Sequence, residues 1–213
     1  MRPVLIDLDG TLIDGPTAES LFFDYLSRRN ILKSKHYFSY FWFMARWFFR
    51  YGVGIKRVNK AYVAGMRRAD VDVYAHSFVK NILLDLVRPE MWARIEEHQQ
   101  QDDIIILLTE APEFLLRPIA KRMEIPYWRG TICAYLMNQY LPKPPVVHPF
   151  GDKKVDIARK ICNELGYDLS HATAYADSSD DLPLLGEVGK PVVVHPDRRL
   201  RREAQRQGWE IIL

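Results

Sequence analysis

Cysteine is scarce in this chain of 213 residues, and its two copies, Cys133 and Cys162, lie far apart. Their spacing is unlike that of a metal site, and both are expected to be small buried side chains in a reducing compartment. Residues 1–3 lead straight into the first apolar run and leave no room for a signal peptide. We therefore expect a cytoplasmic protein.

Acidic residues are absent from residues 28–69, a stretch that holds eleven Lys or Arg. Since the whole chain carries a net charge of +3, the remaining residues sum to −8. Charge that is segregated in this way is informative about binding partners rather than about the fold. Within the stretch, residues 37–51 include ten aromatics, but Arg46 and Arg50 interrupt them. Because a membrane-spanning helix needs about 20 apolar residues, this segment is not expected to cross a bilayer.

Three interpretations of this aromatic, basic segment stay open. Its side chains could pack against the rest of the protein, lie in the headgroup layer of an anionic membrane, or form a dimer interface. Its charge could also steer any phosphomonoester toward a site. A second basic run, residues 198–206, has no interleaved aromatics and is predicted to be a solvated helix face. No nucleic-acid partner is expected.

Short apolar runs alternate with helical patterns along most of the chain. Strands are predicted at residues 4–8, 104–108 and 172–176, with weaker candidates at 131–137, 191–194 and 210–213. Apolar spacings of three and four predict helices over residues 88–101, 112–123, 153–165 and 197–207. This alternation predicts an α/β fold with a doubly wound, Rossmann-like parallel sheet. Ligands of such sheets bind at the carboxyl ends of the strands.

Residues 15–87 break this rhythm, because they contain no convincing strand. Helical patterns occupy residues 17–30, 36–51, 55–66 and 70–86. We therefore predict a helical cap over residues 15–87, inserted after the first strand of a core formed by residues 1–14 and 88–213. Residues 140–150 hold four prolines and are predicted to be a stiff loop.

Polar residues follow each of the three clearest strands. They are Asp7, Asp9, Gly10 and Thr11 after the first strand, Thr109 after the second, and Asp177, Asp180 and Asp181 after the third. Lys153 and Lys154 begin the helix that precedes the third strand. In a parallel sheet these groups gather at one edge, where so many carboxylates are unstable without a cation. All-oxygen ligands suit Mg²⁺, so the pattern predicts a magnesium-dependent phosphoryl-transfer centre.

Four segments, in this order, resemble the motifs of the haloacid dehalogenase (HAD) superfamily. They are DLDGT at residues 7–11, Thr109 after its strand, the lysine of FGDKKVDIA, and ADSSDDLPLL at residues 176–185. Within the superfamily, the chain is similar over essentially its full length to the phosphoserine-phosphatase-like subfamily IB, which carries a helical cap after the first motif. The resemblance implies a phosphoric monoester hydrolase.

The resemblance also implies a role for each motif residue. Asp7 would be the nucleophile that forms an aspartyl-phosphate, and Asp9 would act as general acid and then as general base. The metal would be held by the side chains of Asp7 and Asp177 and by the main-chain carbonyl of Asp9. Asp181 and Asp180 would order the water molecules bound to the metal. The phosphate would be held by Thr109, Glu110, Gly10 and Lys154.

Two of these assignments leave alternatives. Lys154 fits the subfamily's Gly-x-x-Lys pattern from Gly151, but Lys153 lies next to it. Asp180 could instead be the N-cap of a helix. One position departs from the family: phosphoserine phosphatases carry an amine-reading glutamate nine residues after the nucleophile, whereas this chain has Pro16, with Glu19 close by.

We therefore predict a phosphatase of a small phosphorylated metabolite. The alternative is a membrane-associated phosphatase of a lipid phosphate headgroup, similar to phosphatidylglycerol phosphate, with residues 28–69 on an anionic membrane. A non-catalytic scaffold is disfavoured because all four motifs carry competent residues. A receiver module is disfavoured because it carries its phospho-acceptor on a middle strand. The sequence alone leaves the substrate and the oligomeric state open.

Overall fold

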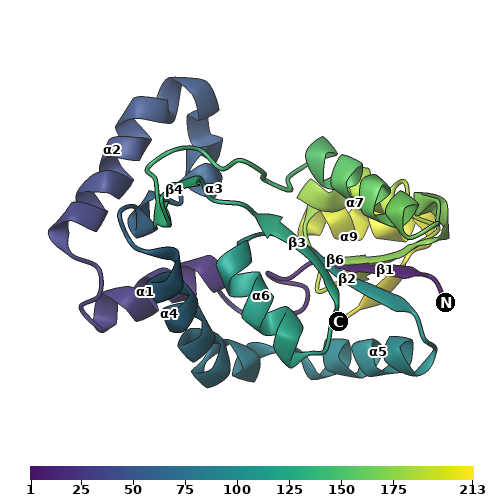
Figure 1. The fold of residues 1–213 in the computed structure, drawn as a ribbon. Coiled ribbons are helices and arrows are strands. Elements are labelled where there is room, and N and C mark those ends of the chain that lie inside the picture. Colours follow the sequence, from purple (N-terminus) through teal and green to yellow (C-terminus); the bar gives the residue numbers. More distant parts are fainter.

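The computed structural model describes residues 1–213 as a three-layer α/β fold built on a parallel sheet (Figure 1). Its six strands lie in the order β3-β2-β1-β6-β7-β8. They are β1 (Pro3–Ile6), β2 (Ile104–Pro112), β3 (Tyr127–Thr131), β6 (Thr173–Ala176), β7 (Lys190–Val194) and β8 (Glu210–Ile212). All five neighbouring pairs are parallel. The predicted fold class is therefore confirmed.

Helices cover both faces of the sheet because its central strands are apolar on both sides. Val4 and Ile6 of β1 belong to one buried cluster, and Leu5 between them belongs to the other. The first cluster includes α5 (Pro89–Gln100) and α6 (Glu113–Arg122). The second includes α7 (Asp152–Glu164), α8 (Leu182–Leu185) and α9 (Arg198–Gln207), which lie above the sheet in Figure 1. Strands buried on both faces are typical of a doubly wound fold.

The chain between β1 and β2 is helical. It forms α1 (Ala18–Arg28), α2 (Ser34–Tyr51), α3 (Ile55–Val58) and α4 (Arg68–Asn81), with the 3₁₀ turns η1 (Gly52–Gly54), η2 (Ala61–Val63) and η3 (Leu83–Leu86). Its two ends meet, since Asp14 N donates to Leu86 O at 2.8 Å and Arg88 N donates to Leu12 O at 3.0 Å. We call residues 15–87 the helical insert.

The insert shares its packing with the sheet region. The Phe22 ring of α1 lies 5.4 Å from that of Phe78 in α4 and 5.6 Å from that of Phe114 in α6, between ring centroids. These rings belong to the same buried cluster as β1 and β2. The insert is thus anchored by an aromatic contact on one side of the sheet.

Residues 55–66 do not form the single helix that was predicted. Helix α3 ends at Val58, because Asn59 adopts an extended backbone with φ −81° and ψ 97°. The Asn59 side chain donates to Tyr40 O at 3.0 Å and accepts from Ala61 N at 3.1 Å. Such side-chain bonds to the backbone compete with helical ones, so the chain turns here and resumes as η2.

The weak strand candidate at residues 131–137 is not one strand, although Thr131 and residues 135–136 do belong to strands. Strand β3 begins earlier, and the later residues form a separate hairpin of β4 (Tyr135–Leu136) and β5 (Gln139–Tyr140). Met137 and Asn138 both have positive φ, 46° and 65°, which is the geometry of a tight two-residue hairpin turn. In addition, β2 extends to Pro112, so Thr109 lies within that strand, where its register with β3 shifts.

Helix α2 is packed along one side only. Phe43 is buried, and Met44, Trp47 and Tyr51 pack around it. The opposite side exposes five of the ten aromatics: Phe38, Phe41, Trp42, Phe48 and Phe49. Figure 1 shows α2 at the end of the molecule far from the sheet. No helix of the structure combines the length and apolar character that a membrane span requires.

Candidate active site

Most of the polar residues predicted from the strand ends line one cavity of about 370 Å³; Gly10 and Thr11 do not. Asp7 follows β1, Asp177 follows β6, and Thr109 stands near the end of β2, so three adjacent strands aim at one place. Among fifteen lining residues, Ala111 alone is hydrophobic. The other predicted residues in this lining are Asp9, Glu110, Lys154, Asp180 and Asp181. A cavity of this composition suits a small, charged ligand.

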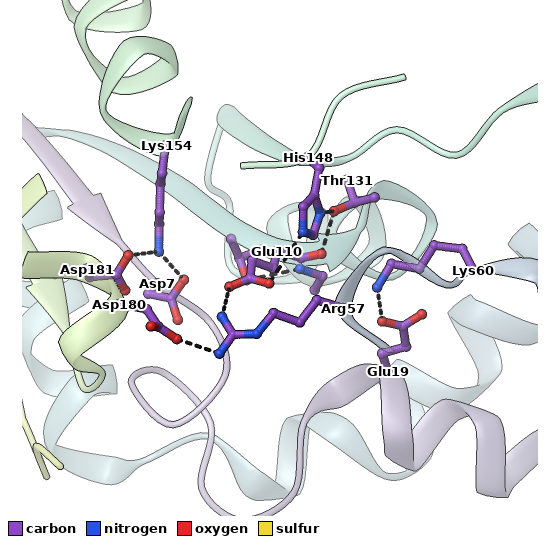
Figure 2. Close-up of polar contacts among 12 residues, drawn as sticks. Asp7, Glu19, Arg57, Lys60, Glu110, Thr131, His148, Lys154, Asp180 and Asp181 are labelled. Atoms are coloured by element: carbon purple, nitrogen blue, oxygen red, sulfur yellow. Dashed lines mark hydrogen bonds and ion pairs between the residues drawn. The ribbon is translucent and has the colours of Figure 1, made fainter. Parts of the chain in front are cut away.

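Lys154 lies at the centre of the ion pairs in this cavity. Its Nζ is 2.7 Å from Asp7 Oδ1 and 2.7 Å from Asp181 Oδ1 (Figure 2). Burial opposes its charge, but the Asp181 and Asp7 carboxylates more than offset this and raise the pKa of Lys154. Its neighbour Lys153 is exposed. The geometry thus favours Lys154 over Lys153 as the lysine of the site.

Asp7 is held on one side only. Lys154 contacts its Oδ1, whereas no hydrogen bond reaches its Oδ2. Burial, together with the like charges of Asp181 and Asp177, raises the pKa of Asp7, although Lys154 opposes the shift. One lysine therefore does not neutralise the carboxylates around it, and a further cation would stabilise them.

Asp9 and Asp177 have no basic partner. Asp9 Oδ1 accepts from the amide of Ala18 at 2.6 Å, at the start of α1, and Asp177 Oδ1 accepts from Thr11 Oγ1 at 3.0 Å. Burial is the main reason why the pKa of each carboxyl rises to about 6. The carbonyl oxygen of Asp9 accepts no hydrogen bond from the chain. Two carboxylates and a carbonyl are thus left without a cationic partner in the cavity.

Gly10 makes room for Asp177. Its φ is +78°, and a Cβ at this position would lie 2.2 Å from Asp177 Oδ2. Its amide donates to Ile13 O at 3.1 Å, so the predicted contact of Gly10 with phosphate stays a prediction. What the geometry does require here is the absence of a side chain.

Gly10→Ala is expected to lower activity at least about tenfold, because Asp177 must move away from the new methyl group. Gly15→Ala is the matched control: φ is +87° there, but a Cβ would meet nothing within 4 Å. Both substitutions carry the left-handed backbone cost of about 1 kcal/mol. Steady-state hydrolysis and urea unfolding separate the two effects, and equal losses of activity in both variants would contradict this role of Gly10.

The helical insert supplies cations that the sequence did not single out. Arg57, at the end of α3, reaches across to the strand side: Nη2 is 2.6 Å from Asp180 Oδ2, and Nη1 is 3.2 Å from Glu110 Oε1 (Figure 2). The insert also pairs the buried Lys60 with Glu19. The signal was the acid-free stretch of residues 28–69, but nothing in its pattern marks which basic residues face inward.

Two further placements refine the predictions. Asp180 is not a helix N-cap. The N-cap of the 3₁₀ turn η5 (Ser179–Asp181) is Ser178, whose Oγ accepts a hydrogen bond from the amide of Asp180 at 3.2 Å. The Glu110 carboxylate pairs with Arg57 and lies 3.6 Å from His148 Nε2. Because the side chain is engaged in this way, a contact between Glu110 and phosphate would be made by its main chain. His148, from the proline-rich loop, contacts Thr131 Oγ1 at 2.9 Å, and burial lowers its pKa to about 4.

The fold and the site together define a Rossmann-like α/β protein with a cavity at its strand ends, lined by carboxylates, two of which pair with Lys154. The chain belongs to the haloacid dehalogenase-like hydrolases, whose family model matches residues 4–186. The predicted resemblance to this superfamily, in its phosphoserine-phosphatase-like branch, is confirmed.

Known proteins similar to this chain include several bacterial relatives. The Streptomyces azureus protein named for inhibition of morphological differentiation is 32% identical over 72% of this chain and 57% of its own length. A probable phosphatase of Mycobacterium tuberculosis is 31% identical over 64% of this chain and 48% of its own. Phosphoserine phosphatase SerB1 of the same species is 28% identical over 96% of this chain and 68% of its own length. The chain thus spans about half the length of the first relatives named.

Solved structures agree on the fold. A protein of unknown function from Bordetella pertussis Tohama I superimposes with a TM-score of 0.83 at 22% identity, covering 100% of this chain and 98% of that one. A substrate-bound phosphoserine phosphatase superimposes with a TM-score of 0.64 at 14% identity, covering 99% and 91%. At these identities the likeness is one of fold.

Proposed function

We propose that this protein is a Mg²⁺-dependent phosphomonoester phosphatase that works through an aspartyl-phosphate on Asp7. The observation that carries the proposal is the position of Asp7 in the cavity. Lys154 holds one of its oxygens at 2.7 Å, and the other accepts no hydrogen bond. A carboxylate fixed in this way can present its second oxygen to a phosphorus atom. The family membership supports the same chemistry.

The donor set fits a magnesium ion. No three His, Cys, Asp or Glu side chains form a ready-made metal cluster. The implied ligands are two side chains, Asp7 and Asp177, and the carbonyl oxygen of Asp9, which has no hydrogen-bond donor. Mg²⁺ usually takes one or two carboxylates and completes its shell with water and phosphate oxygens. When bound, it would neutralise the carboxylates and the substrate phosphate and polarise the transferred group.

The proposed reaction has two steps at phosphorus. In the first, Asp7 attacks and the bond from phosphorus to the leaving oxygen breaks, while Asp9 protonates that oxygen. In the second, water attacks the phosphorus, Asp9 accepts its proton, and the bond to Asp7 breaks to release phosphate. Lys154 and Thr109 would stabilise the charge that develops on the phosphoryl oxygens. Asp9 is oriented for its part by the amide of Ala18.

We further propose that residues 15–87 act as the cap that selects the substrate. Arg57 and Lys60 bring positive charge to the cavity, and Glu19, which also lines it, is already paired with Lys60 and so is not free to pair with an incoming amine. Pro16 stands where an amine-reading glutamate would be expected. A phosphomonoester without an ammonium group therefore suits this cavity better than phosphoserine does.

A lipid phosphate headgroup is the second candidate substrate. The observation that favours it is the row of exposed aromatics on α2, beside unpaired basic residues. Helix α2 leads through η1 into α3, which carries Lys56 and Arg57 of the cavity lining. A headgroup held at a membrane surface could enter from that side.

We expect the protein to hydrolyse p-nitrophenyl phosphate in the presence of Mg²⁺ and to lose this activity when EDTA removes the metal. A panel should add phosphoserine, an amine-free phosphorylated acid of similar size, and a lipid phosphate presented in detergent. Turnover of the amine-free acid is expected to exceed that of phosphoserine by at least about tenfold, since a missing charge partner is worth about 1–3 kcal/mol. Full activity in EDTA would contradict the metal, and preference for phosphoserine would contradict the reading of Pro16.

A further inference from the structure

The exposed face of α2 is an aromatic stripe. Phe41 and Trp42 lie three and four residues after Phe38, and Phe48 and Phe49 lie seven residues, about two helical turns, after Phe41 and Trp42. The exposures of these five side chains run from 52% for Phe48 to 98% for Phe49. Val53, just beyond the helix in η1, is also exposed, at 97%. We call these six residues the aromatic stripe. A contiguous apolar surface of this kind marks an interaction site.

Positive charge lies beside the aromatic stripe without any counter-charge. Lys35, Arg46 and Arg50 are exposed on the same helix, and none of them forms an ion pair with an acidic residue. Arg46 and Arg50 stack on the Trp47 ring, with distances of 5.6 and 5.9 Å to its centroid. Residues 28–69 contain no Asp or Glu at all. The face therefore combines apolar side chains with unpaired cations.

This combination of apolar side chains and cations discriminates among three possible occupants of the face. A second copy docked by a two-fold axis would place two copies of the same positively charged face against each other, and like charges at an interface are unfavourable. A protein partner of neutral charge would leave the cations without counter-charge. An anionic lipid surface satisfies both features, because aromatic rings settle at the headgroup level while lysine and arginine reach the lipid phosphates.

We propose that α2 is a peripheral docking helix that lies in the headgroup layer of an anionic membrane. The aromatic stripe would face the acyl boundary, with Lys35, Arg46 and Arg50 at the level of the phosphates. The packed side of α2, around Phe43, would stay on the protein. This docking does not depend on the proposed phosphatase activity, since none of the stripe residues lines the cavity.

The test is co-sedimentation of the full chain with phosphatidylcholine vesicles, with and without phosphatidylglycerol. We expect pelleting with the anionic vesicles only, weakening as salt is added. Phe41→Ser with Phe49→Ser should lower the bound-to-free ratio at least about tenfold, and so should Arg46→Glu with Arg50→Glu. All variants should keep the hydrolysis rate of p-nitrophenyl phosphate, which verifies that they fold.

Two matched controls alter the same residue types elsewhere. Val73→Ser with Met137→Ser removes exposed apolar side chains, which are 65% and 91% exposed, and Arg198→Glu with Arg201→Glu reverses exposed charges on α9. Both controls should pellet like the unaltered protein. Absence of pelleting at low salt would overturn the proposal, as would equal losses in the controls. Self-association in sedimentation velocity that the stripe substitutions abolish, without vesicle binding, would assign the face to a dimer instead.

Discussion

Asp7→Asn is expected to lower kcat for p-nitrophenyl phosphate at least about 10³-fold, because an amide does not attack phosphorus. Asparagine has nearly the same shape and can keep a contact with Lys154, which is 2.7 Å from the aspartate oxygen. The variant also loses one of several buried like charges around that lysine. It should therefore stay folded and bind inorganic phosphate, so that the loss lies in the chemical step. Steady-state kinetics and circular dichroism measure the two properties separately.

Asp156→Asn is the control for this experiment. Asp156 lies on α7, its side chain is 72% exposed, and its partner is Arg159 on the same helix. It should retain full activity. If Asp7→Asn kept activity within a few fold of the unaltered protein, the nucleophile would be elsewhere and the proposed mechanism would be wrong.

Lys154→Met is expected to destabilise the protein by about 3 kcal/mol or more and to abolish hydrolysis. The substitution leaves the Asp7 and Asp181 carboxylates buried without their cation, and a broken buried ion pair costs far more than an exposed one. Lys153→Met provides the control from the adjacent residue, which is exposed, and it should change the free energy of unfolding by less than about 0.5 kcal/mol. Urea unfolding in the absence of Mg²⁺ measures both.

The loss in Lys154→Met should also depend on pH. Burial and neighbouring carboxylates already raise the pKa of Asp7 above its ordinary value of 3.8, and removal of the lysine raises it further. The folded state then binds a proton that the unfolded state has released, so stability falls as pH rises between those two pKa values. The destabilisation should thus be smaller at about pH 5 than at about pH 8. Similar stability of the two lysine variants at both pH values would contradict the buried ion pairs.

The strands and most helices could be predicted because their signals are local. The apolar run at β1, the alternation of strands with helices, and the acids after β1 and β6 are all properties of short segments. The break at Asn59 could not be predicted, since it depends on a bond to the distant Tyr40 carbonyl. The 135–140 hairpin was missed because its turn, Met137-Asn138, lacks the glycine that usually marks one.

The residues of the site also fall into those that local sequence patterns predict and those that only tertiary packing determines. Asp7, Asp177 and Thr109 could be placed together because parallel strands end at one edge, so position along the sequence fixes position in space. Lys154 was favoured by its spacing from Gly151, and its burial supports that choice. Arg57 reaches the cavity only through the packing of the insert, which no local pattern encodes. Asp180 likewise pairs with Arg57, and Ser178 caps the turn that Asp180 was a candidate to cap.

The proposed mechanism requires a covalent bond between Asp7 and phosphorus, and trapping this bond is the most direct measurement. Acid quenching during turnover, followed by mass spectrometry, should find one added phosphoryl group on the peptide that contains Asp7. The Asp7→Asn protein should show none. A phosphoryl group on another residue, or turnover with no phosphorylated protein in rapid-quench experiments, would contradict the account.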